Sequence, residues 1–309
     1  MAEYECLNFC KKVVFPTESI VKKITDVKRF LVDEFMYGGH ILALGSSFVA
    51  ISTMILFNVA IRWEFLPIIY LMTLCIYNFD HFKELETDFS NNSGRVNHLL
   101  KYKKILPFLI VFYGFVSIVL LLVFGNMESI LFGIIFMTMG LVYSYKVKEF
   151  TSKILAFKNF YTASAVALSV FFTVIYCGYG INYLFFTIFI FLFLRFLINT
   201  SFCDIKDMDT DKKLGLLTLP LYFGKSKFLI LLHLINFLSF IMLLSAIIMN
   251  IIPISGSFLL IVNLYCFYYI EKSKNPKTNI SILSDVMVDG EFIFWPIFLI
   301  AGKFFFMLV

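Results

Sequence analysis

Two short stretches of the sequence carry carboxylates at helical spacing, although only 15% of the 309 residues are charged. In the stretch YNFDHFKELETD, three carboxylates lie four residues apart and share one face of a helix: Asp80, Glu84 and Asp88. In the stretch CDIKDMDTDKK, spacings of three and four place another set on one face: Asp204, Asp207 and Asp211. Like charges at these spacings repel each other, so both rows predict a bound cation.

The ligand atoms of the two rows indicate which cation this is. Carboxylate oxygens without a His or Cys at ligand spacing favour a hard divalent ion. Mg²⁺ fits such a site when a phosphate shares it, because Mg²⁺ usually takes one or two carboxylates together with substrate oxygens and water. The rows alone leave two interpretations open: a carboxylate, metal and phosphate site at the mouth of one cavity, or solvated helix ends whose acids pair with nearby lysines. Two rows of matching design favour the first.

The elements that position both rows are membrane spans. Hydrophobic residues make up 60% of the chain and aromatic residues 19%, whereas soluble domains are about 45–50% apolar and about 25% charged. This composition excludes a soluble enzyme, a disordered chain and a disulfide scaffold. Several apolar segments approach or exceed the length that spans about 30 Å of hydrocarbon, at residues 41–61, 65–80, 105–125, 129–145, 160–181, 183–203, 228–250, 254–270 and 292–308. We therefore predict an all-α fold, a polytopic membrane bundle of nine transmembrane helices.

The basic residues predict how this bundle is oriented in a cell membrane. All but three of the 26 Lys and Arg residues precede the first span or follow the second, fourth, sixth and eighth spans; the exceptions are Arg62, Arg195 and Lys303. Cytoplasmic loops carry such an excess of positive charge, so the N-terminus and the loops beside both acidic rows are expected in the cytoplasm. The acidic N-terminus MAEYEC lacks the apolar segment of a signal peptide.

An amphipathic helix is predicted ahead of the first span, at residues 17–36, where apolar side chains form one stripe opposite the lysines. We expect this helix to lie on the membrane surface. The chain then divides into a cytoplasmic amphipathic segment, residues 1–38, and a nine-helix membrane domain, residues 39–309. A net charge of +5 without basic clusters argues against nucleic-acid binding. The six cysteines show no metal or redox spacing, and no feature indicates an obligate protein partner.

The two acidic rows resemble the paired aspartate-rich motifs of the UbiA-type intramembrane polyprenyltransferases. The second row, followed by KKLGLLTLPLYFG, is the most specific part of the resemblance. The resemblance extends to the nine-span layout and to three pairs of polar residues: Arg195 and Asn199, Tyr143 and Ser144, and Lys158 and Asn159. The first row departs from the family pattern, because Asp80 and Glu84 stand where the family usually has Asn and Asp. Of the Arg-Pro segment that often follows it, only Arg95 remains.

The resemblance implies transfer of a polyprenyl group from an allylic prenyl diphosphate to a lipid-soluble, often aromatic acceptor within the membrane. It also implies Mg²⁺, expected as two ions that bridge the diphosphate and are held by Asp80, Glu84, Asp88, Asp204, Asp207 and Asp211. Four of these residues are expected to act directly in catalysis: Asp80, Asp88, Asp204 and Asp207. Cationic or amide side chains on the same side are expected to bind the diphosphate: Arg95, Lys146, Lys153, Lys158, Lys206 and Asn199.

Polar side chains inside the spans are expected to have a function or a partner on another helix. Arg195 is expected either to form a structural ion pair or to bind diphosphate. Four residues are expected to make hydrogen bonds between helices: His40, His233, Asn236 and Asn263. Asp289 and Glu291 are expected to cap the last span, with acceptor binding as the alternative role.

Two other functions remain open. A terpene cyclase would use the same ionisation but let the cation attack a double bond in its own chain. A cation-coupled transporter would use the acidic rows to bind its ion, but transporters tend to break their helices near mid-membrane. Here Pro67, Pro107 and Pro253 lie near span ends, and only Pro296 is a few residues into a span. A non-catalytic lipid-binding module would not need two metal-type rows.

Overall fold

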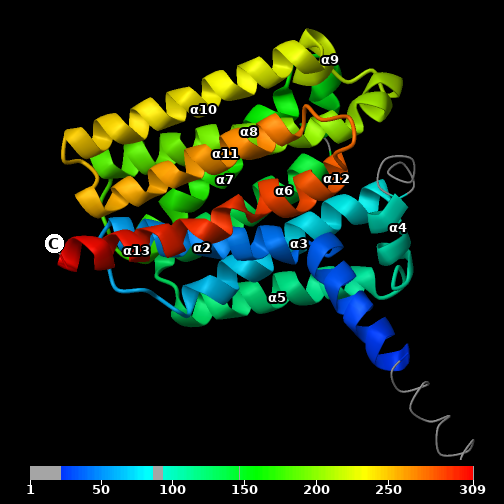
Figure 1. Cartoon of the computed structure of the whole chain (residues 1–309). Helices are drawn as coiled ribbons and strands as arrows, with labels where there is room; N and C mark the ends of the chain where they lie inside the picture. The colour runs from blue at the N-terminus through cyan, green and yellow to red at the C-terminus, as the bar shows by residue number, and fades with distance from the viewer. Residues whose placement is uncertain (1–21, 86–92, 146, 309) are drawn as a thin grey trace, which may run out of the picture.

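The computed structural model describes residues 22–85, 93–145 and 147–308, and within these ranges the chain is helical and contains no strands. The long helices run side by side in one bundle (Figure 1). They are α2 (His40–Leu56), α3 (Phe65–Glu84), α5 (Leu106–Phe124), α6 (Met127–Tyr145), α7 (Phe157–Tyr176), α8 (Tyr183–Lys213), α10 (Lys225–Ile248), α11 (Leu260–Lys272) and α13 (Phe294–Leu308). Shorter elements connect them: α4 (Ser93–Leu100), η2 (Val147–Ser152), α9 (Leu219–Phe223), η3 (Ile254–Leu259), α12 (Ile280–Ile282), η4 (Leu283–Val288) and η5 (Glu291–Ile293).

The predicted all-α membrane bundle is confirmed. In the described ranges, eight helical segments are long and apolar enough to cross a membrane, and the number becomes nine when α2 is counted with the helix Lys22–Tyr37 before it. Large apolar side chains cover the outside of the bundle; Phe108 on α5 is 76% exposed and Leu264 on α11 is 70% exposed. Helices satisfy their own backbone groups, and an apolar exterior of this extent is suited to contact with lipid.

Helix α8 is longer than a span requires. Its 31 residues extend over about 46 Å at 1.5 Å per residue, compared with a hydrocarbon thickness of about 30 Å. The additional turns carry Asp204, Asp207 and Asp211 at the C-terminal end of α8. Figure 1 shows α4, α9 and α12 at this end of the bundle, which we call the acidic end, while the C-terminus lies at the opposite end.

The last span begins earlier than the predicted residues 292–308. It starts with α12 and continues through η4 and η5 into α13. The middle element, η4, is a π-helix, a form that is usually confined to single turns and is frequent at functional sites. Because η4 packs against α8, it brings a further segment of the chain to the acidic end.

The predicted amphipathic helix is present from Lys22 to Tyr37, and residues 17–21 of the prediction lie outside the described residues. It is bent by 56° from α2 and projects from the bundle at the acidic end (Figure 1). Gly39 lies at the bend with φ 85°, and a Cβ atom there would come within 2.4 Å of the Tyr77 ring. A larger residue would therefore meet both backbone strain and a clash.

Glu34 fastens this helix to the bundle. Its carboxylate contacts His98 Nε2 at 2.6 Å on α4, Tyr102 Oη at 2.9 Å after α4, and His40 Nε2 at 3.3 Å on α2. Burial alone would raise the pKa of Glu34, but the hydrogen bonds with His40, His98 and Tyr102 outweigh burial and lower the pKa to about 2. Burial and the negative charge of Glu34 raise the pKa of Tyr102.

Candidate active site

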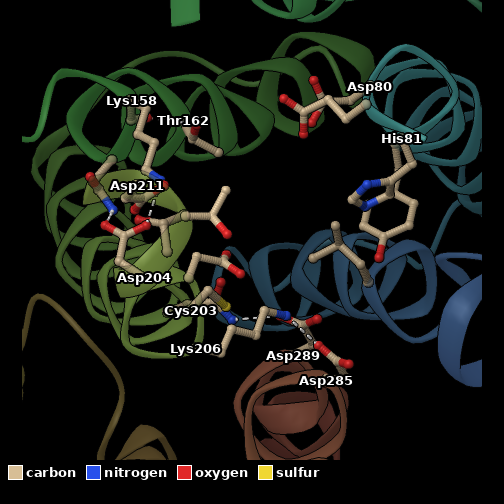
Figure 2. Close-up of a pocket in the computed structure, with 18 of the residues that line it drawn as sticks. Asp80, His81, Lys158, Thr162, Cys203, Asp204, Lys206, Asp211, Asp285 and Asp289 are labelled. Carbon is tan, nitrogen blue, oxygen red and sulfur yellow. Dashed lines mark hydrogen bonds and ion pairs between the residues drawn. The ribbon is translucent and has the colours of Figure 1, made fainter. Parts of the chain in front are cut away.

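A pocket of about 260 Å³ opens at the acidic end, between α3, α4, α7, α8 and η4. Seven carboxylates line it: Asp80, Glu84, Asp204, Asp207, Asp211, Asp285 and Asp289. Three cationic side chains line it as well: Arg95, Lys158 and Lys206. Figure 2 shows Asp80 on one side of the open space, Asp204 and Asp211 on another, and Asp285 with Asp289 on a third. The pocket therefore carries a clear excess of negative charge.

The first acidic row reaches the pocket through the end of α3. Asp80 and Glu84 are one helical turn apart, and both line the pocket; Asp88 lies outside the described residues. His81 joins them, because single ligand atoms of Asp80, His81 and Glu84 lie within 4.8 Å of one another. The expectation that no histidine stands at ligand spacing was therefore wrong. The signal was present in the sequence, since His81 is three residues before Glu84.

The second acidic row lies on α8, and Asp204, Asp207 and Asp211 all line the same pocket. Their environments differ. Asp204 and Asp211 are buried, with 2% and 4% exposure, and both contact Lys158 of α7. Asp207 has no hydrogen-bond or ion-pair partner among the residues that the structure describes. The two interpretations left open by the sequence thus apply to different members of one row: two acids pair with a lysine, and one faces the pocket.

The third wall was not predicted. Asp285 and Asp289 lie on and immediately after the π-helix η4 and face α8. Asp285 contacts Lys206 Nζ at 2.6 Å, and Asp289 accepts a hydrogen bond of 3.0 Å from Asn199. We expected Asp289 to cap the last span, but its carboxylate lines the pocket. A sequence signal for this wall exists, because both acids precede the last apolar segment at a spacing of four.

The residues expected to bind diphosphate are distributed unevenly. Arg95, Lys158, Lys206 and Asn199 line the pocket, and Arg95 Nη1 lies 3.2 Å from His81 Nε2. Lys153 is exposed and is not part of the described pocket wall. Lys146 lies outside the described residues.

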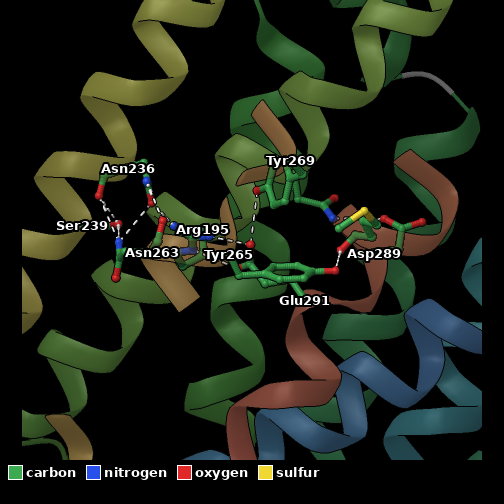
Figure 3. A network of polar contacts seen from close by, with 10 residues as sticks. Arg195, Asn236, Ser239, Asn263, Tyr265, Tyr269, Asp289 and Glu291 are labelled. Carbon is green, nitrogen blue, oxygen red and sulfur yellow. Dashed lines mark hydrogen bonds and ion pairs between the residues drawn. The ribbon is translucent and has the colours of Figure 1, made fainter. Parts of the chain in front are cut away.

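Arg195 is fully buried beside the pocket, in a polar network between α8, α10, α11 and the start of the last span (Figure 3). Its Nε donates to Glu291 Oε1 at 2.8 Å, and Nη2 donates to Glu291 Oε2. Arg195 Nη1 donates to Asn236 Oδ1, and the Tyr269 hydroxyl donates to Glu291 at 3.2 Å. The ion-pair alternative for Arg195 is therefore the one observed, and Glu291 serves this pair instead of capping a helix.

The other intramembrane polar residues have the interhelical partners that we expected. Asn236 and Asn263 exchange hydrogen bonds between α10 and α11. His233 of α10 contacts Glu271 of α11 at 2.8 Å, and His40 of α2 contacts the Tyr70 hydroxyl of α3.

An apolar cavity of about 180 Å³ adjoins the acidic pocket between α2, α3, α6, α7 and α8. The two share six lining residues: Leu42, Tyr77, Asp80, Tyr143, Thr162 and Phe196. On α3 the lining runs from Asp80 to Ile69, which is about 16 Å along the helix axis. A ligand with a charged head and an apolar tail fits the acidic pocket together with the adjoining apolar cavity.

These features define a class of protein: a polytopic helical membrane protein with an acidic pocket at one end of its bundle and an apolar cavity behind it. The chain belongs to the UbiA prenyltransferase family, whose model matches residues 35–296. The resemblance seen in the acidic rows is thereby confirmed.

Solved structures with the same fold share little sequence with this chain. A UbiA homologue from Archaeoglobus fulgidus, bound to DMAPP and Mg²⁺, is 14% identical with a TM-score of 0.60, over 87% of this chain and 99% of its own. The apo UbiA homologue from Aeropyrum pernix K1 is 10% identical with a TM-score of 0.66, and the match covers 86% of this chain and 98% of the homologue. A structure of digeranylgeranylglyceryl phosphate synthase is 18% identical with a TM-score of 0.54, and the match covers 89% of this chain and 98% of the synthase. Comparison with curated protein sequences gives no match.

Proposed function

We propose that this chain transfers a polyprenyl group from an allylic prenyl diphosphate to a lipid-soluble, aromatic acceptor, and that it requires Mg²⁺. The observation that carries the proposal is that a pocket lined by carboxylates, with acidic rows from two separate helices, adjoins an apolar cavity and shares lining residues with it. An allylic prenyl diphosphate has the matching shape and polarity. The fold shared with a UbiA homologue bound to GPP and Mg²⁺ supports the same substrate class.

The donor atoms of the pocket fit Mg²⁺. Carboxylate oxygens are its preferred protein ligands, and Mg²⁺ takes only a few of them when a phosphate completes its coordination. Asp80 and Glu84 of α3 and Asp207 of α8 would hold it, with Asp88 completing the first row as the sequence predicts. Bound there, Mg²⁺ would withdraw electrons from the diphosphate oxygens and so stabilise the leaving group.

The side chains of the chain supply the remaining parts of the reaction. Arg95 would hold the diphosphate, because a guanidinium donates two parallel hydrogen bonds to phosphate oxygens. Lys206 and Asn199 of α8 line the same pocket, and Lys146 and Lys153 remain predictions from the sequence. The apolar cavity would hold the prenyl chain away from water, so that the allylic cation is not hydrolysed.

The bond changes follow from this placement. The allylic carbon–oxygen bond breaks and its electron pair leaves with the diphosphate, which gives an allylic cation at the junction of the two spaces. Tyr77, Tyr143 and Phe196 line that junction, and aromatic faces attract cations. A nucleophilic atom of the acceptor then bonds to the allylic carbon and loses its proton.

We also propose the membrane placement that the charge distribution predicts. The acidic end would face the cytoplasm, because the excess of Lys and Arg lies in the segments at this end. The helix Lys22–Tyr37 would lie on the membrane surface, with Ile24, Val27 and Leu31 in contact with lipid, since these side chains are 58–62% exposed.

The test is prenyl transfer by the full chain in lipid nanodiscs, supplied with labelled GPP, Mg²⁺ and a panel of lipid-soluble phenols and quinols. We expect pyrophosphate and a prenylated acceptor, loss of both with EDTA, and recovery with Mg²⁺. Asp207→Asn should lower turnover by about 100-fold or more, as for other groups that stabilise developing charge. Asp209→Asn is the matched control, because Asp209 is exposed on the same helix and off the row.

Three outcomes would contradict the proposal. Full activity in EDTA excludes the metal requirement. A cyclic product formed without acceptor assigns the chain to the terpene cyclases. Ion-gradient-driven cation flux in proteoliposomes without pyrophosphate release assigns it to the transporters.

A further inference from the structure

Three cations line the described part of the acidic pocket, and each contacts a group on another wall. Arg95 of α4 contacts His81 of α3, and Lys206 of α8 contacts Asp285 of η4. Lys158 of α7 differs from both, because it contacts two carboxylates of one metal-type row. Its position decides how many members of that row are available to a divalent ion.

The side chain of Lys158 points towards both Asp204 and Asp211 (Figure 2). Its Nζ is 2.8 Å from Asp204 Oδ1 and 3.3 Å from Asp211 Oδ2. The second oxygen of Asp204 accepts a hydrogen bond of 2.9 Å from the Asn159 amide. Both oxygens of Asp204 are thus engaged, and an ammonium group at these distances occupies the space that a shared metal ion would need.

Burial and the backbone both fix Lys158 in this position. The side chains of Lys158, Asp204 and Asp211 are only 13%, 3% and 6% exposed, so little water is present to compete for the contacts. The start of α7 is tied to the segment that follows α8, because Ala156 N–H donates to the Leu217 carbonyl at 2.8 Å. This bond holds the backbone of Lys158, two residues further, close to the end of α8.

Asp207 provides the contrast within the same row. It lies three residues after Asp204 and four before Asp211, and it lines the pocket. In the part of the chain that the structure describes, no side chain hydrogen-bonds or pairs with it.

We propose that Lys158 is a permanent counter-ion of the second acidic row. Its ammonium group stays paired with Asp204 and Asp211, also with substrate bound, so Asp207 is the member of the row that ligates a divalent ion. Lys158 thereby sets the number of ions that the pocket takes. The inference rests on one part of the proposed function, namely that the pocket binds divalent ions. Ion binding can be measured without turnover.

The experiment counts Mn²⁺ ions bound to the full chain in nanodiscs by electron paramagnetic resonance, with inorganic pyrophosphate present. Lys158→Met removes the charge at nearly constant volume, and we expect one additional Mn²⁺ per chain, since Asp204 and Asp211 then need another cation. Lys158→Arg should keep the wild-type number. Lys227→Met, an exposed lysine on α10, is the matched control and should also keep it.

A second pair of variants decides the question if Lys158→Met fails to fold. Asp207→Asn should lose one Mn²⁺ per chain, whereas Asp211→Asn should keep the wild-type number, because its partner is Lys158. Loss of an ion in Asp211→Asn would overturn the proposal. So would an unchanged ion count in Lys158→Met together with a tenfold higher donor KM, which would make Lys158 a diphosphate ligand. If wild-type protein binds Mn²⁺ as expected but transfers no prenyl group, the proposed function fails and the inference on Lys158 stands.

Discussion

The buried pair Arg195–Glu291 offers the sharpest quantitative prediction. Arg195 is 0% exposed and Glu291 is 2% exposed, and two hydrogen bonds join the guanidinium to the carboxylate (Figure 3). Glu291→Leu removes both of these acceptors and leaves the buried guanidinium hydrogen-bonded to Asn236 Oδ1. Breaking such a pair by removing one partner costs about 3–5 kcal/mol in the free energy of unfolding.

The double variant should cost less than either single variant. Arg195→Met combined with Glu291→Leu removes both charges and fills the space with apolar atoms, an exchange that is often neutral or stabilising. Asn236 keeps a partner, because Asn263 donates to its Oδ1 at 3.1 Å. The Tyr269 hydroxyl loses its acceptor, which costs about 1–3 kcal/mol for a buried polar group. We therefore expect the double variant to be about 2 kcal/mol more stable than Glu291→Leu alone.

The measurement is unfolding by increasing mole fractions of SDS in mixed micelles, followed by tryptophan fluorescence; Trp295 is 1% exposed, whereas Trp63 is already 67% exposed in the folded chain. Thr187→Val on α8 is the control, since the Thr187 hydroxyl donates to the Tyr183 carbonyl of its own helix, and the change should alter stability by less than about 0.5 kcal/mol. A double variant that is less stable than both single variants would refute the reasoning. It would show that the pair stabilises the bundle more than apolar packing does.

Two further predictions concern the apolar cavity and the N-terminal helix. Gly140→Ala would place a Cβ atom 2.5 Å from Ile76 Cδ1 and so displace Ile76 into the apolar cavity that both residues line. We expect kcat/KM to fall several-fold more for long prenyl donors than for DMAPP. An equal loss of kcat/KM for all donors would contradict this. The pKa of Glu34 is lowered to about 2 from its ordinary 4.5, so its contribution to stability is present above pH 4.5 and is lost as the pH falls towards 2. In thermal unfolding measured from pH 5 to pH 3, Glu34→Gln should remove the part of the loss of stability that comes from protonation of Glu34. A loss of stability equal to that of the wild type would show that Glu34 does not fasten the helix.

The sequence predicted what depends on local geometry. Asp80 and Glu84, and likewise Asp204, Asp207 and Asp211, line one pocket because spacings of three and four place side chains on one helix face whatever the tertiary structure. The spans were predictable for a similar reason, since a segment of about 20 apolar residues forms a helix in lipid regardless of its neighbours.

The sequence did not predict features that depend on the packing of distant segments. The contact of Lys158 with Asp204 and Asp211 depends on the register between α7 and α8, which no local spacing encodes. Asp285 and Asp289 enter the pocket through the π-helix η4, where the backbone departs from the periodicity that sequence reasoning assumes. His81 was overlooked, because the sequence was taken to hold no histidine at ligand spacing, although its spacing from Glu84 was visible.

The contacts between side chains on different walls of the acidic pocket bear on the order in which ligands enter the proposed active site. Lys158 and Lys206 each pair with carboxylates of the pocket itself, so their positive charges are largely compensated within the protein. The seven carboxylates still outnumber the three cations, and a diphosphate that approached alone would meet a repulsive field, which low-dielectric walls strengthen. We therefore expect the divalent ion to be bound first or to arrive with the diphosphate. The proposed enzyme would then discriminate against free prenyl diphosphate by electrostatics, before any contact with the prenyl chain is made.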